Sequence, residues 1–152
     1  MADGRTILVL NGPNLNLLGM REPAIYGRAS LADIEAACRR RAESLGLALD
    51  FRQSNHEGQL IDWVQAARGR MAGIAINPGG LSHSSIALLD ALIAVELPVV
   101  EVHLSNIFKR EPYRRHSFIS EGARGVICGL GPQGYILAID ALADIIGNNK
   151  DA

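Results

Sequence analysis

The chain has 152 residues, of which 48% are hydrophobic and 20% are charged, as in an average soluble globular domain. Its formal net charge is −1, so it carries no positive field that would favour nucleic acid or an anionic membrane. The two cysteines, Cys38 and Cys128, are far apart, and the four histidines form no HxxxH or HExxH pair, so the sequence predicts neither a disulfide nor a metal site.

Strands and helices are expected to alternate along the chain. In chain order, the sequence predicts a strand at 5–10, a helix from Ser30 to the turn at Gly46, a strand at 47–52, a helix at 59–68, a strand at 73–76, a helix at 83–95, strands at 99–104 and 125–128, and a helix at 135–146. Asp33 stands three residues after Ser30, which is the spacing of a helix capping box. Gly46 suits the left-handed position that follows a helix.

The alternation, with strands that are almost continuously apolar, predicts a parallel sheet covered on both faces. Five strands at this length indicate an α/β flavodoxin-like fold, doubly wound and three-layered, in which ligands bind at the carboxyl ends of the strands. We expect a single catalytic domain over residues 1–152, with its core at about 5–146 and a frayed polar tail from residue 147.

The sequence shows no targeting segment. Its N-terminus lacks the apolar region and cleavage site of a signal peptide. The longest apolar stretch, residues 84–100, is interrupted by Asp90, Glu96 and Pro98, so it does not predict a membrane span. These features predict a cytoplasmic protein with no membrane partner.

Two loops, at residues 11–29 and 105–124, are much longer than the roughly 2–6 residues that such folds usually need between strand and helix. Both follow strands, so both are expected at the edge of the sheet where ligands bind. The first contains Arg21 and Tyr26 among several asparagines. The second contains the basic run RRH, in which an arginine can clamp a carboxylate with two hydrogen bonds.

Glu101 and His103 carry the strongest signal for chemistry. They are two residues apart on a predicted strand, so they point to the same side of the sheet. Ionisable groups in a sheet covered on both faces are costly unless paired. A carboxylate that orients an imidazole and favours its protonated form is a common acid–base arrangement. A buried ion pair without a chemical role remains the alternative interpretation.

A glycine turn follows the third predicted strand directly. Its sequence, Asn77–Pro78–Gly79–Gly80, allows backbone N–H groups to approach a polar or anionic ligand closely. His83 stands near the start of the next helix, where the helix dipole also favours anions. The same residues also suit a simple turn, which is the alternative.

Taken in order, the segments resemble the type II dehydroquinases. The matching segments are ILVLNGPNLNLLG and REPAIYG at 7–27, DFRQSNHEGQLIDW at 50–63, INPGGLSHSSIALLDAL at 76–92, PVVEVHLSNIFKRE at 98–111, RRHSFIS at 114–120 and GVICGLGPQGY at 125–135. The resemblance covers nearly the whole chain. Met20, Leu81, Phe108 and Pro112 depart from the pattern without removing a functional group, which puts the movement of the first loop in doubt rather than the reaction.

The resemblance implies a reaction and a set of roles. The reaction is the elimination of water from 3-dehydroquinate to give 3-dehydroshikimate, with no cofactor and no metal. Tyr26 would be the base, Arg21 would favour its phenolate, His103 would be the acid supported by Glu101, and Asn14 would hold a water at the enolate. The residues implied to bind substrate are Asn77, His83, Asp90, Leu104, Ser105 and Arg114. The implied assembly is a homo-dodecamer, a tetramer of trimers, in which Asp90 reaches into a neighbouring site.

Other functions are weighed against this one. A flavodoxin-like binding or signalling module would need a cofactor or a phosphoacceptor. The first strand ends in Asn11–Gly12–Pro13 rather than in acidic residues, and the chain lacks GxGxxG and GxxxxGK[ST]. An inactive relative is a second alternative. A Schiff-base dehydratase would need a lysine in an apolar setting, and the chain has only Lys109 and Lys150.

Overall fold

The computed structural model describes residues 5–20, 22–26 and 28–150, and within these residues a five-stranded sheet forms the centre. The strands are β1 (Thr6–Asn11), β2 (Ala48–Gln53), β3 (Gly73–Asn77), β4 (Val99–His103) and β5 (Gly125–Cys128). All neighbouring pairs are parallel, and their order is β2-β1-β3-β4-β5. This is the flavodoxin-like order, so the predicted fold class is confirmed.

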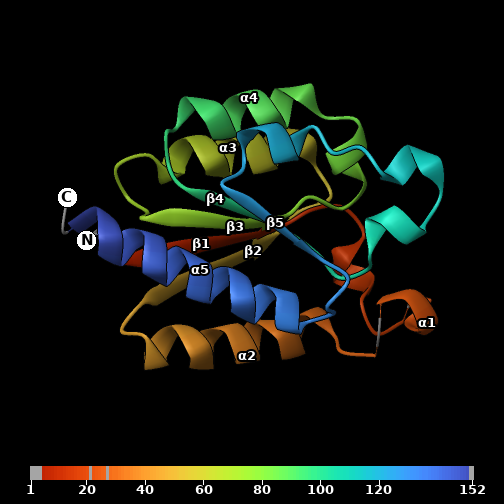
Figure 1. The fold of residues 1–152 in the computed structure, drawn as a ribbon, viewed down its shortest axis with the longest axis horizontal. Coiled ribbons are helices and arrows are strands. Elements are labelled where there is room, and N and C mark those ends of the chain that lie inside the picture. The colour runs from red at the N-terminus through yellow and green to blue at the C-terminus, as the bar shows by residue number, and fades with distance from the viewer. Residues whose placement is uncertain (1–4, 21, 27, 151–152) are drawn as a thin grey trace.

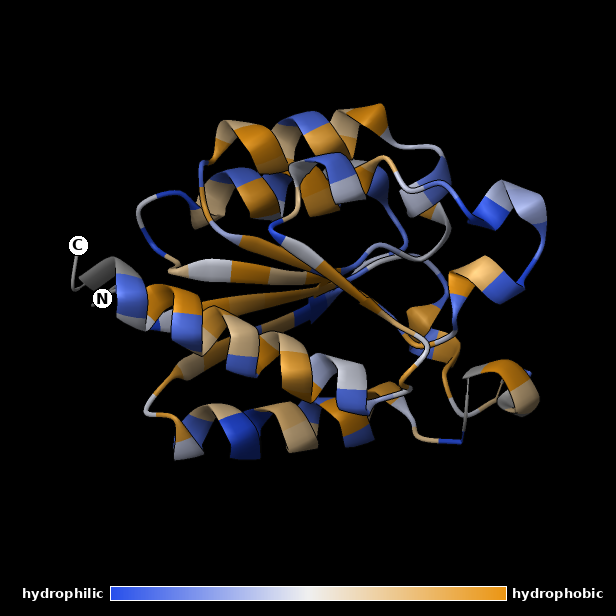
Figure 2. Cartoon of the chain, viewed as in Figure 1, coloured by the Kyte–Doolittle hydropathy of each residue, from blue (hydrophilic) through white to orange (hydrophobic). Residues whose placement is uncertain are grey.

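Helices cover both faces of the sheet, as Figure 1 shows. Helices α2 (Leu31–Ser44) and α5 (Gln133–Lys150) lie on one face, and α3 (Glu57–Ala67) and α4 (Ile86–Ala94) lie on the other. Apolar residues run along the strands between these layers (Figure 2). Each face has its own hydrophobic core, because alternate residues of every central strand point to opposite sides. Both cores need apolar side chains, which explains the almost continuously apolar strands.

Helix α2 begins and ends as its local sequence predicts. The Ser30 hydroxyl accepts a hydrogen bond from the Asp33 N–H at 3.1 Å, and the Asp33 carboxylate accepts one from the Ser30 N–H at 3.0 Å. This capping box satisfies two N–H groups that have no partner inside the helix. At the other end, Gly46 has a φ of 70°, which costs glycine little. Both predicted helix signals are confirmed.

The helix predicted at 83–95 is divided, which the sequence analysis did not foresee. A 3₁₀ helix spans Gly79–His83, and α4 begins only at Ile86. Ser85 separates them, because its hydroxyl accepts the N–H of Leu88 at 3.0 Å and so caps a new helix. The 3₁₀ turn therefore belongs to the edge of the sheet rather than to the helix layer.

Helix α5 is longer than the sequence indicates. The helix predicted at 135–146 continues to Lys150, so residues 147–150 of the predicted polar tail are helical. Asn148 Nδ2 donates to Asp144 Oδ2, one turn earlier, at 3.3 Å. Extending a formed helix is favourable, whereas Gly147 costs only about 1 kcal/mol. Along the described chain, neither α5 nor any other helix is long and apolar enough to cross a membrane.

The first long loop and most of the second lie beyond the carboxyl edge of the sheet, and the end of the second, at Ile119–Gly122, returns over the sheet beside α4 (Figure 1). Each contains short helices. The first contains a 3₁₀ helix at Leu15–Leu17 and helix α1 (Pro23–Tyr26); the second contains 3₁₀ helices at Ile107–Lys109, Pro112–Arg114 and Ile119–Gly122. Leu15 and Ile119 are buried, so both loops pack against the body of the protein. Packed loops can hold side chains in fixed positions over the sheet edge.

Candidate active site

A cavity of about 150 Å³ lies where β3 and β4 end, enclosed by the two long loops. Among the residues singled out from the sequence, those that line it are Asn14, Asn77, His83, His103, Leu104, Ser105 and Arg114. The other lining residues are Pro13, Leu15, Gly79, Gly80, Ile107 and Arg110. The cavity occupies the place where doubly wound folds bind their ligands. Segments that are distant in the sequence therefore meet at one site.

His103 and Glu101 form a buried pair at this cavity. His103 Nε2 hydrogen-bonds to Glu101 Oε2, and both side chains lie on the α3–α4 side of β4. Glu101 is completely buried and His103 is 5% exposed. Glu101 lies behind His103 rather than on the cavity wall. The carboxylate accepts, so Nε2 carries a proton and Nδ1 is the nitrogen left for a ligand.

Two serines of the second loop surround the Glu101 carboxylate. Ser120 Oγ donates to Glu101 Oε1 at 2.7 Å. Burial raises the pKa of Glu101, but hydrogen bonds from His103 and Ser120 outweigh that effect, and the pKa lies below its usual value of 4.5. The Ser117 hydroxyl also lowers the pKa of Glu101. This hydroxyl is buried and forms no well-aligned hydrogen bond with any of the described residues. Glu101 is therefore an anion, and its hydrogen bond to Nε2 fixes the orientation of the His103 ring.

The turn after β3 forms part of the cavity wall. Asn77 Oδ1 accepts the Gly79 N–H at 3.2 Å, and Ser82 Oγ donates to the Gly79 carbonyl at 2.9 Å. His83 Nδ1 lies 2.7 Å from the carbonyl oxygen of His116. A carbonyl can only accept, so Nδ1 of His83 donates there. In its neutral form His83 then offers Nε2 to the cavity as an acceptor.

The loops that follow β1 and β3 are packed backbone against backbone. Gly12 N–H donates to the Asn77 carbonyl at 2.8 Å. A Cβ atom at Gly12 would lie 2.3 Å from the Pro78 oxygen, and one at Gly79 would lie 2.9 Å from the Pro13 oxygen. Only glycine allows these approaches. The two glycines therefore set how closely the loop after β1 approaches the turn after β3.

Asn14 is held at the cavity by its backbone. It has a φ of 71°, a left-handed conformation that asparagine tolerates better than most residues. Its N–H donates to Asn55 Oδ1 at 3.0 Å, and Gln53 Nε2 donates to the same oxygen at 3.1 Å. The last residue of β2 and a residue just after it thus orient the loop that follows β1.

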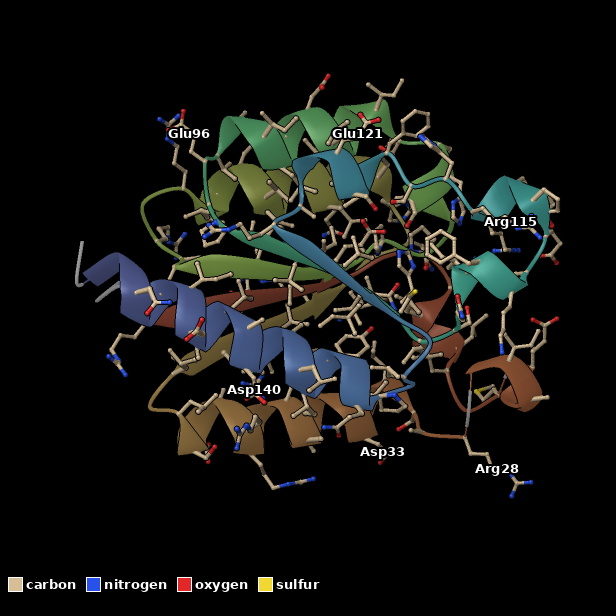
Figure 3. The ribbon with its side chains drawn as sticks, viewed as in Figure 1. Arg28, Asp33, Glu96, Arg115, Glu121 and Asp140 are labelled. Carbon is tan, nitrogen blue, oxygen red and sulfur yellow. The ribbon has the colours of Figure 1, made fainter. Side chains whose placement is uncertain are left out.

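Two guanidinium groups make the cavity suitable for an anion. Arg114 Nε donates to Glu111 Oε2 at 2.8 Å, and Arg110 donates to Ser105 Oγ at 3.3 Å. Both arginines line the cavity, whereas Arg115 is exposed at the outer end of the loop (Figure 3). Carboxylates and phosphates are the usual ligands of paired arginines. Within the described residues, no group of three His, Cys, Asp or Glu side chains could hold a metal ion.

Known proteins show which family has this arrangement. A family model described as dehydroquinase class II matches residues 5–143. The 3-dehydroquinate dehydratase of Azorhizobium caulinodans is 62% identical over 138 residues, which cover 91% of this chain and 93% of that protein. The 3-dehydroquinate dehydratase 2 of Pseudomonas aeruginosa is 61% identical over 140 residues, 92% of this chain and 95% of that protein. The chain belongs to the class II dehydroquinase family.

A solved structure of a class II dehydroquinase supports the same assignment. The type II dehydroquinase of Propionibacterium acnes superimposes with a TM-score of 0.89 at 44% identity. The match covers 92% of this chain and 97% of that chain. The resemblance that the sequence indicated is confirmed over nearly the whole length.

Three residues that the class II dehydroquinase resemblance implied are not placed at the cavity. Arg21 lies outside the described residues, and of Tyr26 only the backbone, at the end of α1, is described. Asp90 is exposed on α4 and does not line the cavity. The roles of these residues stay predictions.

Arg110 lines the cavity, although the sequence placed it only in the basic run before RRH and not among the site residues. The sequence signal was available, because Arg110 stands in KRE on the same loop as the RRH run. A basic residue on a long loop is usually solvated, so its direction could not be predicted from the local sequence. The 3₁₀ turn at Ile107–Lys109 directs it inward, and Arg110 is only partly exposed.

Proposed function

We propose that this chain is a hydro-lyase that removes water reversibly from 3-dehydroquinate to give 3-dehydroshikimate, a step of the shikimate pathway. One observation carries the proposal: the buried Glu101–His103 pair opens onto a cavity that also contains two arginines. The pair supplies an acid, and the arginines suit a carboxylate substrate. Relatives more than 60% identical over nine-tenths of the chain are named for this reaction.

The elimination needs a base and an acid on two different atoms of the substrate. Tyr26, as a phenolate favoured by the positive charge of Arg21, takes the proton from the carbon next to the ketone. The electron pair of that C–H bond forms an enolate, whose oxygen is stabilised by a water that Asn14 holds. The enolate then expels the hydroxyl group, and His103 gives that group the proton with which it leaves as water. Exchange with solvent returns both residues to their starting states.

The remaining site residues hold the substrate in this orientation. Arg114 pairs with the carboxylate of the cyclohexanone acid, which its guanidinium can bind with two hydrogen bonds. Polar groups of Asn77, His83 and Ser105, together with the backbone at Leu104, fit the hydroxyl and carboxylate oxygens. The cavity volume of about 150 Å³ is comparable to that of a protein cavity that accepts benzene, a single six-membered ring.

The proposal extends to the assembly and its setting. We infer that residues 1–152 act as one catalytic domain in a cytoplasmic homo-oligomer, a dodecamer built as a tetramer of trimers. In that assembly Asp90 serves the site of a neighbouring subunit. Its exposure on α4, away from its own chain's cavity, agrees with such a role.

The decisive experiment is an ultraviolet assay of the purified protein mixed with 3-dehydroquinate. The product is a conjugated enone carboxylate that absorbs where the substrate does not. We expect absorbance to rise with the wild type, and turnover by Tyr26→Phe to fall by about 10²–10⁴-fold because the base is lost. Tyr113→Phe, which removes the hydroxyl of an exposed tyrosine, should behave as the wild type.

Each failure of this assay has its own meaning. No absorbance change with folded, assembled wild type would refute the proposed reaction. Normal turnover by Tyr26→Phe would leave the reaction standing and remove Tyr26 as the base. Treatment with borohydride and substrate tests for a Schiff-base route, which requires inactivation at a lysine. We expect no inactivation, since Lys109 is exposed and lies outside the cavity.

A further inference from the structure

A buried tyrosine hydroxyl lies directly behind the cavity wall. Tyr135 is the third residue of α5 and is 1% exposed. Its hydroxyl accepts a hydrogen bond from Asn77 Nδ2 at 2.9 Å and donates one to Asn11 Oδ1 at 2.6 Å. Asn11 and Asn77 are paired residues at the ends of the neighbouring strands β1 and β3. Tyr135 therefore bridges two strand ends from the α2–α5 face of the sheet.

These hydrogen bonds form a chain with a single possible direction. At one end the Gly79 N–H, which can only donate, bonds to the Asn77 side chain at 3.2 Å. At the other end the Arg52 carbonyl, which can only accept, bonds to the Asn11 side chain at 3.1 Å. Between these ends each amide must turn its oxygen toward one neighbour and its nitrogen toward the next. The orientations of both amides are thus dictated by backbone groups, which removes the usual ambiguity between oxygen and nitrogen.

Burial keeps the middle of the chain in its neutral form. It raises the pKa of Tyr135 far above the ordinary value for tyrosine, an effect that the Asn77 hydrogen bond only partly offsets. The hydroxyl consequently stays protonated and can donate to Asn11 while it accepts from Asn77. Hydrogen bonds that point in the same direction along a chain also polarise one another.

The fixed amide has a consequence for the cavity. Asn77 lines it, and its Nδ2 has two hydrogens, of which Tyr135 accepts one. We propose that Tyr135 is a positioning residue, which holds the Asn77 amide so that its second N–H is presented to an oxygen acceptor of the substrate. This inference rests on the proposed function, in which Asn77 binds substrate. It adds that the donor identity of Asn77 is set by α5, outside the cavity.

The test is a double-mutant cycle in the ultraviolet assay. Tyr135→Phe keeps the ring and removes only the hydroxyl, so Asn77 loses the partner that orients it. We expect kcat/KM to fall by about tenfold or more, mainly through KM, because one substrate hydrogen bond is weakened in the ground state as in the transition state. Asn77→Ala should lower kcat/KM at least as much. In the Asn77→Ala background, Tyr135→Phe should then have almost no further effect.

A second variant covers the case in which Tyr135→Phe does not fold, as judged by thermal unfolding. Asn11→Ala removes the acceptor at the far side of the hydroxyl and leaves both Tyr135 and Asn77 in place. Asn11→Ala should raise KM, as Tyr135→Phe does. This increase too should disappear in the Asn77→Ala background. Tyr113→Phe again serves as the matched control for the loss of a tyrosine hydroxyl.

The possible outcomes separate this inference from the proposed function. Wild-type kcat/KM for Asn77→Ala would overturn the substrate-binding role and the positioning role with it, while the reaction itself still shows in the assay. An impaired Asn77→Ala beside an unimpaired Tyr135→Phe would overturn the positioning role alone. Equal losses from Tyr135→Phe with and without Asn77 would mean that Tyr135 supports the fold and not the amide, and would also overturn it.

Discussion

At the scale of single residues, the protein keeps a carboxylate ionised where water does not reach. Glu101 is fully buried, yet three neighbouring side chains make its pKa lower than usual: His103, Ser120 and Ser117. An isolated buried carboxyl would instead hold its proton. The hydrogen bonds therefore decide its charge, and the charge in turn orients His103.

Replacing Glu101 by Gln should show this linkage in the pH dependence of stability. The folded pKa is lowered, so the ionised form stabilises the fold above the ordinary pKa of 4.5, and that contribution is lost as pH falls through the lower folded value. We expect Glu101→Gln to lower the free energy of unfolding by about 1–3 kcal/mol at neutral pH. The difference from wild type should shrink well below pH 4.5, where Glu101 itself becomes neutral.

Urea unfolding at a series of pH values measures this difference. Glu121→Gln, which changes an exposed carboxylate on the loop that carries Ser117 and Ser120 (Figure 3), is the control and should shift stability little at any pH. If the difference in unfolding free energy between wild type and Glu101→Gln stayed constant at strongly acidic pH, the result would contradict the negative charge assigned to Glu101.

At the scale of elements, the site depends on how closely two loops approach. The loops after β1 and β3 meet at Gly12 and Pro78, and their residues Asn14 and Gly80 both line the cavity. Because the contact is between backbones, no side-chain rearrangement can relieve an added atom. A small change in the distance between the loops therefore displaces the residues that line the cavity and should lower the reaction rate.

Gly12→Ala should accordingly reduce both stability and turnover. Its Cβ would lie 2.3 Å from the Pro78 oxygen, so the loops must separate and the bond from Gly12 N–H to Asn77 must lengthen. We expect the unfolding free energy to fall by about 1–3 kcal/mol, with a larger proportional loss of kcat/KM. Gly58→Ala is the matched control, since a Cβ there meets no atom within 4 Å. If thermal unfolding and the ultraviolet assay gave the same results for both variants, the close approach of Gly12 to Pro78 would not be needed for stability or activity.

The sequence predicted the elements better than their ends. Apolar runs located all five strands, because buried parallel strands need apolar residues on both faces. The pair Glu101 and His103 was also predictable, since two-residue spacing puts them on one side of a strand. The break at Ser85 was not, because a serine inside an apolar helical pattern reads equally well as a tolerated interior residue. Tyr135 was predicted only as the first residue of a helix, and only the three-dimensional arrangement shows its hydroxyl beside two asparagines.

At the scale of the whole molecule, α4 has a surface suited to contact with another subunit. Ile86 and Ile93 are each more than half exposed, and Asp90 lies between them on the same side of the helix. Val126, on the edge strand β5, is also exposed. Apolar side chains gathered around a carboxylate are typical of a surface that a partner covers. This supports the proposal that Asp90 acts in a neighbouring site.

Mixing two inactive variants tests that proposal. His103→Ala lacks the acid, and Asp90→Asn lacks the residue proposed to cross the interface. If Asp90 serves a neighbour, random co-assembly gives about a quarter of the sites both intact residues, and activity should return toward that fraction. If Asp90 serves its own chain, every site stays defective. Activity of the mixture no higher than the mean of the two separate variants would therefore exclude the shared site.

The hydroxyl of Tyr135 joins the beginning of the chain to its last helix. Its two partners, Asn77 and Asn11, stand 58 and 124 residues earlier. During translation, both asparagines are synthesised well before α5. A nascent chain that pairs β1 with β3 therefore still lacks the hydroxyl group that we propose to orient Asn77. If Tyr135 has the proposed role, the Asn77 amide takes its substrate-binding orientation only when α5 docks on the sheet.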